Sequence, residues 1–154
     1  MSELVRTERL NFEDLFFFER EVTQPQIIKK ELDMIMPKLR KIGIEHKNIV
    51  ISKVVGKNPT KKTMLMQIRV PISINDGLSN FFKRHPQYEL EKNFSINEGV
   101  KLAITNNENE FREGIKLLMK QRPDLDLSNN SIIELSHISY YGDVLDFELF
   151  LEDK

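Results

Sequence analysis

The fold is decided by a stretch that occurs twice, as Met64-Leu-Met-Gln-Ile-Arg-Val70 and again, 81 residues later, as Leu145-Asp-Phe-Glu-Leu-Phe-Leu151. In both copies every second side chain is apolar, and the side chains between them are mixed. This is the period of a strand with one face against a core. The repeat predicts two equivalent strands, each with its apolar face under a helix.

Two long helices are predicted ahead of these strands. The first starts at Thr23, where Gln26 completes a capping box and Pro25 lies in the first turn. The second starts at Asn107, with Glu110 three residues later. Their buried stripes are Ile28, Leu32 and Ile35 in the first helix and Phe111, Ile115 and Leu118, 83 residues later, in the second. Gly114 inside the second helix indicates close packing against the sheet.

The remaining apolar segments complete the order strand, helix, strand, strand twice. The predicted strands are residues 15–22, 48–55, 63–74, 88–96, 100–105, 131–140 and 144–152. This order predicts an α+β protein, a pseudo-twofold tandem of two strand-helix-strand-strand units. Its antiparallel sheet would carry both long helices on one face. We expect one domain over residues 1–154, with half-domains at 15–76 and 88–153 and a connector at 77–87 that contains a short helix.

The composition limits the possible functions. The 154 residues are 40% hydrophobic and 31% charged, which suits one compact domain. A net charge of -1 gives no general attraction for nucleic acid. The absence of cysteine favours a cytoplasmic location, and no apolar stretch is long enough for membrane insertion. The first half is net positive and the second net negative, which allows a head-to-tail homodimer or an acidic partner on the first half, although solvated helix faces that differ in charge give the same pattern.

The sequence gives little support for catalysis. His46, His85 and His137 are far apart and have no metal spacing, and phosphate-binding and nucleophile motifs are missing. Glu134 and Glu148 could form a carboxylate pair, but the face that Glu134 takes depends on an unknown strand register. We therefore expect no catalytic residue, no metal and no cofactor, and interpret the chain as a protein that is not an enzyme. Hydrolysis would require a water-excluding pocket with a carboxylate of raised pKa.

A binding surface is predicted on the face of the sheet that carries no helix. Strand alternation turns a mixed set of side chains to this face, and the offset of 81 places them in pairs around the pseudo-twofold axis. The mixture suits a groove that binds a partner, although an ordinary solvated sheet face has the same pattern. The predicted binding residues are Leu65, Gln67, Arg69, Asp146, Glu148 and Phe150.

The order of elements, closed by the segment from Leu145 to Leu151, resembles the GyrI-like domain over Leu15 to Glu152. That superfamily is a tandem of strand-helix-strand-strand units and forms the small-molecule sensor of several bacterial regulators. The resemblance implies a carboxylate in a central groove that meets cationic or aromatic ligands. Glu148 is the candidate by position, and its replacement by Gln would weaken binding of a hydrophobic cation. The chain has no tryptophan to complete an aromatic cage.

A closer likeness is to a small family of Firmicute proteins on the same scaffold, encoded beside type VII secretion genes and LXG toxins. The residues that carry it are Asn93-Phe-Ser-Ile-Asn-Glu-Gly99 with Leu102-Ala-Ile-Thr105, Met66-Gln-Ile-Arg-Val-Pro71 and Phe147-Glu-Leu-Phe150. The likeness implies a chaperone or adaptor that holds a helical segment of the secreted toxin. The main expectation is thus a cytoplasmic, non-enzymatic protein with a protein partner. The alternative is a GyrI-like protein that binds a small hydrophobic cation.

Overall fold

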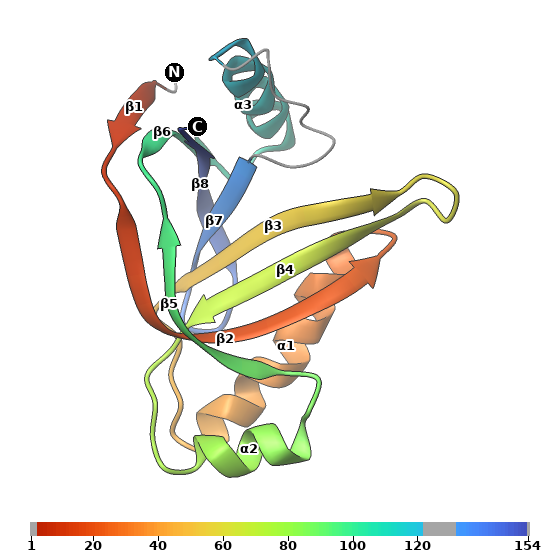
Figure 1. Cartoon of the computed structure of the whole chain (residues 1–154), viewed down its shortest axis with the longest axis vertical. Helices are drawn as coiled ribbons and strands as arrows, with labels where there is room; N and C mark the ends of the chain where they lie inside the picture. Colours follow the sequence, from red (N-terminus) through yellow and green to blue (C-terminus); the bar gives the residue numbers. More distant parts are fainter. Residues whose placement is uncertain (1–2, 122–131, 154) are drawn as a thin grey trace.

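The computed structural model describes residues 3–121 and 132–153, and in these parts it contains one eight-stranded antiparallel sheet and three helices (Figure 1). The strand order is β1-β6-β8-β7-β3-β4-β2-β5. The strands are β1 (Leu4–Thr7), β2 (Leu10–Val22), β3 (Ile49–Asn58), β4 (Thr63–Pro71), β5 (Glu89–Ile96), β6 (Gly99–Thr105), β7 (Ile132–Ile138) and β8 (Val144–Glu152). The helices are α1 (Gln26–Lys41), α2 (Leu78–Arg84) and α3 (Glu108–Gln121). The predicted α+β class is confirmed.

The two halves of the sheet are related by a pseudo-twofold axis between β3 and β7. Outward from this central pair lie β4, β2 and β5 on one side and β8, β6 and β1 on the other. The joint between the halves is short, because β3 and β7 pair only from Ile49 opposite His137 to Ser52 opposite Glu134. The tandem organisation expected from the repeat is therefore present, with the repeated strands β4 and β8 in equivalent places.

The edge strands lie where the sequence did not place them. β2 begins at Leu10, five residues earlier than predicted, and its first part pairs with β5. β5, which the sequence analysis grouped with the second half, thus lies on the first half's side of the sheet. The β2–β5 pairing skips Glu13 and Asn93, and Asn93 has a φ of 62°. Figure 1 shows both strands curving strongly. At the other edge, β1 pairs with β6 and had not been predicted.

The start of α1 differs from the predicted capping box. Pro25 occupies the N-cap position, and no side chain caps the helix. Thr23 therefore lies too early to accept from the first turn, so that part of the prediction is wrong. The buried stripe of Ile28, Leu32 and Ile35 is confirmed.

The start of α3 follows the prediction more closely. The Asn107 side chain accepts a hydrogen bond from the Glu110 backbone N–H at 3.1 Å. The Asn107 backbone N–H donates to the Thr105 carbonyl at 2.8 Å, and the Glu110 carboxylate accepts from Thr105. A Cβ on Gly114 would lie 2.9 Å from Leu102 Cδ2, so the helix packs very closely on β6, as expected. The helix stop predicted at Pro123 lies outside the described residues.

The core has parts on both faces of the sheet. On the helix-covered face, α1 and α2 pack on the first half and α3 packs on the second. On the opposite face the curved sheet forms a second apolar cluster. The buried residues there are Leu15, Ile51, Ile96, Ile133, Leu135 and Phe150. The centre of the helix-free face is consequently filled by apolar side chains, and Phe150 is 2% exposed.

Candidate functional site

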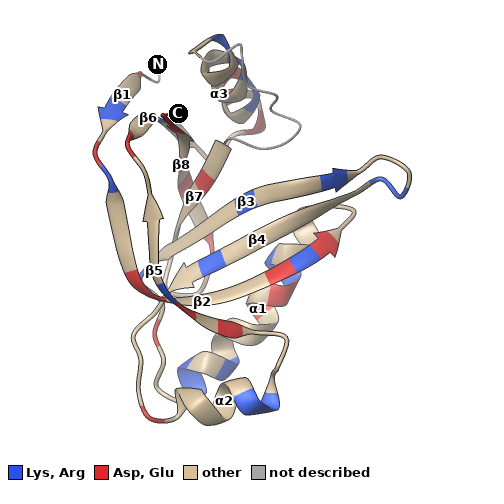
Figure 2. Cartoon of the chain, viewed as in Figure 1, with Lys and Arg blue, Asp and Glu red and all other residues tan. Residues whose placement is uncertain are grey.

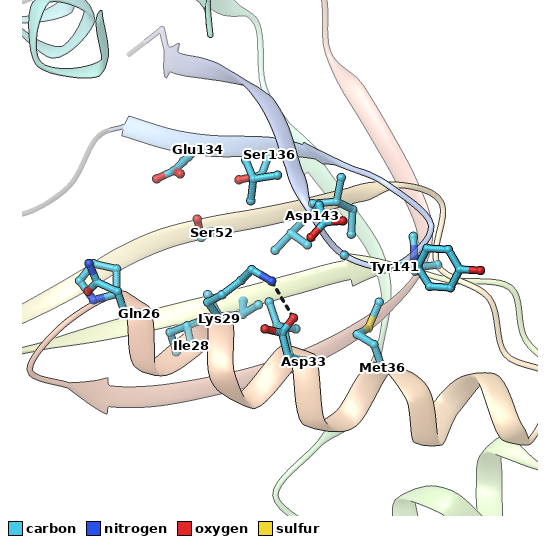
Figure 3. Close-up of a pocket in the computed structure, with 18 of the residues that line it drawn as sticks. Gln26, Ile28, Lys29, Asp33, Met36, Ser52, Glu134, Ser136, Tyr141 and Asp143 are labelled. Atoms are coloured by element: carbon cyan, nitrogen blue, oxygen red, sulfur yellow. Dashed lines mark hydrogen bonds and ion pairs between the residues drawn. The ribbon is translucent and has the colours of Figure 1, made fainter. Parts of the chain in front are cut away.

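The main cavity lies on the helix-covered face, between α1 and the turn that joins β7 to β8 (Figure 3). Its volume is about 670 Å³. Most of its wall is apolar, contributed by Ile28, Leu32, Met36, Val50, Met66, Ile68, Ile138, Val144 and Phe147. Such a volume and lining are typical of small-molecule sites.

The polar part of the cavity is its floor, at the pseudo-twofold axis. Ser52 of β3 and Glu134 of β7 are direct cross-strand neighbours, and Val50 and Ser136 form the next helix-facing pair. Strand alternation sends the residue between each pair, such as Leu135, to the opposite face. The paired strands β3 and β7 therefore place the Glu134 carboxylate and the hydroxyl groups of Ser52 and Ser136 on the floor of an apolar cavity.

Among the residues that line the cavity, Glu134 has a raised pKa. Burial raises the pKa of its carboxyl group to about 7. Among residues 3–121 and 132–153 no side chain forms a hydrogen bond or ion pair with it. A half-buried carboxylate that has no partner among the described residues favours either a proton or a cationic ligand.

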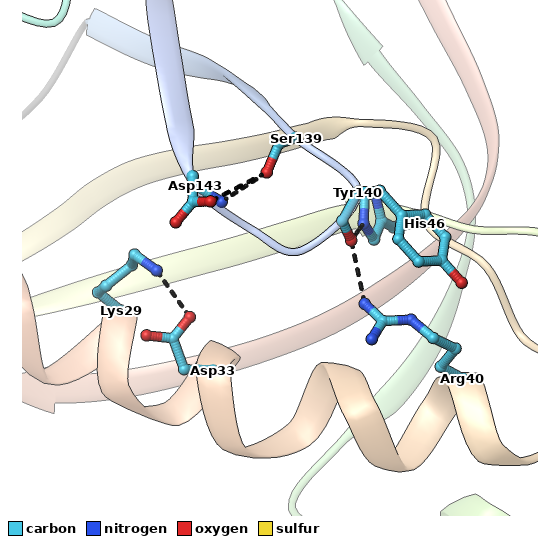
Figure 4. A network of polar contacts seen from close by, with 7 residues as sticks. All are labelled: Lys29, Asp33, Arg40, His46, Ser139, Tyr140 and Asp143. Carbon is cyan, nitrogen blue, oxygen red and sulfur yellow. Dashed lines mark hydrogen bonds and ion pairs between the residues drawn. The ribbon is translucent and has the colours of Figure 1, made fainter.

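The two cations at the rim of the cavity are already engaged. Lys29 Nζ lies 2.6 Å from Asp33 Oδ1 in an ion pair along α1 (Figure 4). Arg40 donates to the Tyr140 carbonyl at 3.0 Å, and its guanidinium group lies 4.4 Å from the centre of the Tyr140 ring. Neither contact involves Glu134, so its charge stays uncompensated within the described structure.

The β7–β8 turn is held in place beside the mouth of the cavity. The Asn48 backbone N–H donates to His46 Nδ1 at 2.9 Å, so the proton of the neutral ring is on Nε2. Nε2 in turn donates to the Tyr140 carbonyl at 2.8 Å. This anchored turn presents Tyr141, which is 77% exposed, at the mouth (Figure 3). The Arg40 guanidinium group already lies 5.6 Å from the centre of the Tyr141 ring.

The six residues predicted from the sequence lie on the other face of the sheet. Met66, Ile68 and Val70 are in the helix-side core, which sends Leu65, Gln67 and Arg69 to the helix-free face. Arg69 is 8% exposed. It binds Glu91 at 2.6 Å and Gln67 at 3.2 Å.

In the second half, Phe150 belongs to the apolar cluster that fills the centre of the helix-free face. Asp146 is largely exposed, with His137 Nε2 4.0 Å away. The structure therefore brings these residues onto one face but uses Phe150 for packing. Binding by the set of six stays a prediction.

Glu148 has a different environment from Glu134. Its carboxylate binds Lys101 at 2.8 Å and His137 at 2.6 Å. Burial alone would raise the pKa of Glu148, but these two hydrogen bonds lower it below the usual value. The register places Leu135 opposite Glu148 and Glu134 opposite Leu149. The two glutamates thus point to opposite faces, and the carboxylate pair considered from the sequence is not formed.

Sequence reasoning noticed Glu134 but missed its cavity. The available signal was a lone charge inside Ile132-Ile-Glu-Leu-Ser-His-Ile138, a strand that is otherwise mostly apolar. Choosing the face required the β7–β8 register, which a turn several residues long does not fix. In the parts of the chain that the structure describes, no group of three side chains could hold a metal ion. None of the helices described is long and apolar enough to cross a membrane.

Comparison with known proteins supports the fold. Neither protein-family models nor curated protein sequences give a match. Among solved structures, the EcmrR C-terminal domain has a TM-score of 0.59 and 11% identity over 100% of this chain and 98% of that domain. EcmrR in an EcmrR–DNA complex has a TM-score of 0.61 and 13% sequence identity over 98% of this chain. This chain spans 56% of that protein. A hydrolase from Listeria innocua has a TM-score of 0.51 and 9% sequence identity, over 97% of this chain and 90% of that one. The chain has a GyrI-like fold.

Proposed function

We propose that the chain is a non-enzymatic binding protein of the cytoplasm that takes one small, apolar organic cation into the cavity above β3 and β7. The observation that carries this proposal is the Glu134 carboxylate, which has no partner among the described residues and lies at the floor of a largely apolar cavity of about 670 Å³. The resemblance to GyrI-like sensors agrees with a ligand of this class. The carboxylate that we assign to the ligand is Glu134, in place of Glu148.

The preference for an organic cation follows from desolvation. A compact, strongly hydrated ion would lose too much hydration in an apolar cavity, whereas a delocalised cation with apolar substituents loses less. Its substituents would pack on the α1 side chains, and its charge would meet Glu134. Binding would also favour the ionised form of Glu134 and release a proton whenever the empty site is protonated.

Calorimetric titration with tetraphenylphosphonium at pH 8 tests the proposal. Glu134→Gln removes the charge with little change in shape, and we expect it to weaken binding at least about tenfold, or 1.4 kcal/mol. Glu148→Gln is the matched control, since that carboxylate lies on the other face and already has two partners. Equal affinities of the wild type and Glu134→Gln would remove Glu134 from the site, and a loss confined to Glu148→Gln would restore the sequence-based assignment.

Hydrolysis in the same cavity has one observation in its favour. A carboxyl group with a pKa of about 7 is suited to act as a general base near neutral pH. No hydrogen bond orients Glu134 among the described residues, which favours binding over catalysis. Incubation with p-nitrophenyl acetate separates the two functions. Turnover that Glu134→Gln abolishes would establish an enzyme.

The adaptor role for a secreted LXG toxin stays a prediction from the sequence likeness. It would require a toxin segment that binds the folded chain. Co-expression with an LXG toxin gene from the same genome, followed by size-exclusion chromatography, tests it. A stable complex is the expected result, and separate elution of the two proteins at micromolar concentration would contradict it.

A further inference from the structure

A second hollow lies on the outer flank of α3, away from the central cavity. It is a groove of about 640 Å³ between α3 and β6. Leu102, Ile104, Gly114, Leu117 and Met119 supply its apolar lining, and Glu110, Glu113, Lys116 and Lys120 line its polar part. It shares no lining residue with the central cavity. Met119 is 46% exposed.

The pseudo-twofold axis identifies the equivalent place in the first half. Ile68 of β4 corresponds to Leu149 of β8, and these residues pair with Phe18 and Leu102 respectively. Phe18 therefore corresponds to Leu102. The helix offset of 83 residues makes Glu31 of α1 equivalent to Gly114 of α3. The groove beside α3 thus corresponds to the flank between α1 and β2.

In the first half this flank is covered by the chain itself. The Tyr88 ring lies 4.7 Å from the Phe16 ring and 5.4 Å from the Phe18 ring, and its hydroxyl donates to Glu31 at 2.6 Å. Tyr88 is only 3% exposed.

The short helix α2 brings Tyr88 to this place. α2 ends at Arg84, four residues before Tyr88, and its Phe82 ring stacks 6.0 Å from Phe16. Figure 1 shows α2 beside α1, with no helix of the described chain in the equivalent place beside α3. A short helix with an aromatic anchor is therefore the element that closes this position in the present fold.

We infer that the groove between α3 and β6 is a docking site for a short amphipathic helix of a protein partner, which occupies the place that α2 and Tyr88 take in the first half. The anchor is phenylalanine, leucine or methionine, because Gly114 offers no acceptor where Glu31 accepts the Tyr88 hydroxyl. The docking is independent of ligand binding in the central cavity.

The rim of the groove defines the charge of the partner. Lys120 forms no ion pair with the described residues, and Lys116 lies 3.6 Å from Glu113 in a solvent-exposed pair. Figure 2 shows charged residues of both signs along α3. An acidic residue one turn from the anchor would bind these lysines and set the direction of the partner helix.

Selection from a display library of scaffolded helical peptides, randomised on one face, tests the inference on the full chain. We expect binders with an apolar anchor and an acidic residue one helical turn away. Met119→Asp and Leu117→Gln should each weaken them about tenfold or more, as at interface hot spots. The matched control is Met34→Asp on α1, because Met34 is equivalent to Leu117 and is 54% exposed. It should leave binding unchanged, as should Glu134→Gln.

Each other result overturns the inference. Recovery of no binder, or of binders that tolerate both α3 variants, would show that the groove does not accept a helix. If Met34→Asp weakens the peptides as much as the α3 variants do, the docking site is not the groove between α3 and β6. Self-association of the wild type in sedimentation, abolished by Met119→Asp, would assign the groove to a second copy of the chain. Melting temperatures of all variants exclude misfolding as the cause.

Discussion

In the first half of the sheet, Tyr88 and α2 fill the flank between α1 and β2, whereas in the second half no described element covers the equivalent groove between α3 and β6. The helices also approach the sheet differently. Position 31 of α1 is a glutamate that binds Arg20 and Tyr88, and the equivalent position of α3 is Gly114 in contact distance of Leu102. With the same order of elements, the first half covers its apolar flank with its own residues, and the second half leaves apolar side chains exposed along the groove between α3 and β6.

The two faces of the sheet differ in a similar way. Glu148 on the helix-free face has two cationic or polar partners, and Glu134 on the helix-covered face has none among the described residues. Four substitutions test how far these two comparisons hold.

The largest effect is expected for Tyr88→Ala, which would open the flank of the first half. Losing a buried aromatic side chain should lower the free energy of unfolding by about 3–4 kcal/mol. Tyr88→Phe keeps the ring and loses only the hydrogen bond to Glu31, at about 1 kcal/mol. Urea denaturation measures both. Equal, small losses would mean that the flank is stable without its aromatic cover.

Glu134→Gln should stabilise the ligand-free protein at pH 8. Burial raises the pKa of Glu134 from 4.5 to about 7, so the folded state binds the proton more tightly than the unfolded state. The contribution of Glu134 to the free energy of unfolding is then largest below pH 4.5 and falls as the pH rises to about 7, by up to about 3 kcal/mol. The Gln variant lacks this fall. Unfolding curves at pH 5 and pH 8 give the difference, and parallel pH profiles of the two proteins would contradict the unpaired carboxylate.

Gly114→Val should destabilise the second half by about 2 kcal/mol, because its Cβ would be forced against the Leu102 side chain. Lys120→Val on the same helix is the control, and it should change stability by less than about 0.5 kcal/mol. Thermal and urea unfolding provide the measurement. A neutral Gly114→Val would show that α3 can move away from β6, which the close contact does not allow.

The smallest effect is expected for Glu148→Gln, with the opposite dependence on pH. Its pKa is lowered in the folded state, so its contribution is present above the unfolded value of 4.5 and is lost as the pH falls below it. We expect Glu148→Gln to lower the free energy of unfolding by at most about 1 kcal/mol at pH 7, and to have no effect in acid. A gain in stability at pH 7 would instead place an uncompensated charge on the helix-free face.

Much of the fold followed from local patterns. The stripes of α1 and α3, the alternation of β4 and β8 and the short helix in the connector are all present. Two edge strands were not predicted correctly. β1 has only four residues and is defined by its pairing with β6. β5 pairs with β2 because β2 extends five residues further than its apolar run indicated. Such long-range pairings leave no periodic signal in either strand.

The sequence alone determined the element order, the internal repeat and the face of each residue within its own strand, since these depend on side-chain periods of 2 and 3.6 residues. Only the tertiary structure decided which face is hollow. Curvature of β2 and β5 filled the helix-free face with Phe150 and its neighbours, and the β7–β8 register turned Glu134 into the cavity under α1. A shift of one residue in that register would exchange Glu134 for Leu135, so the candidate site depends on strand pairing that no local stretch of sequence encodes.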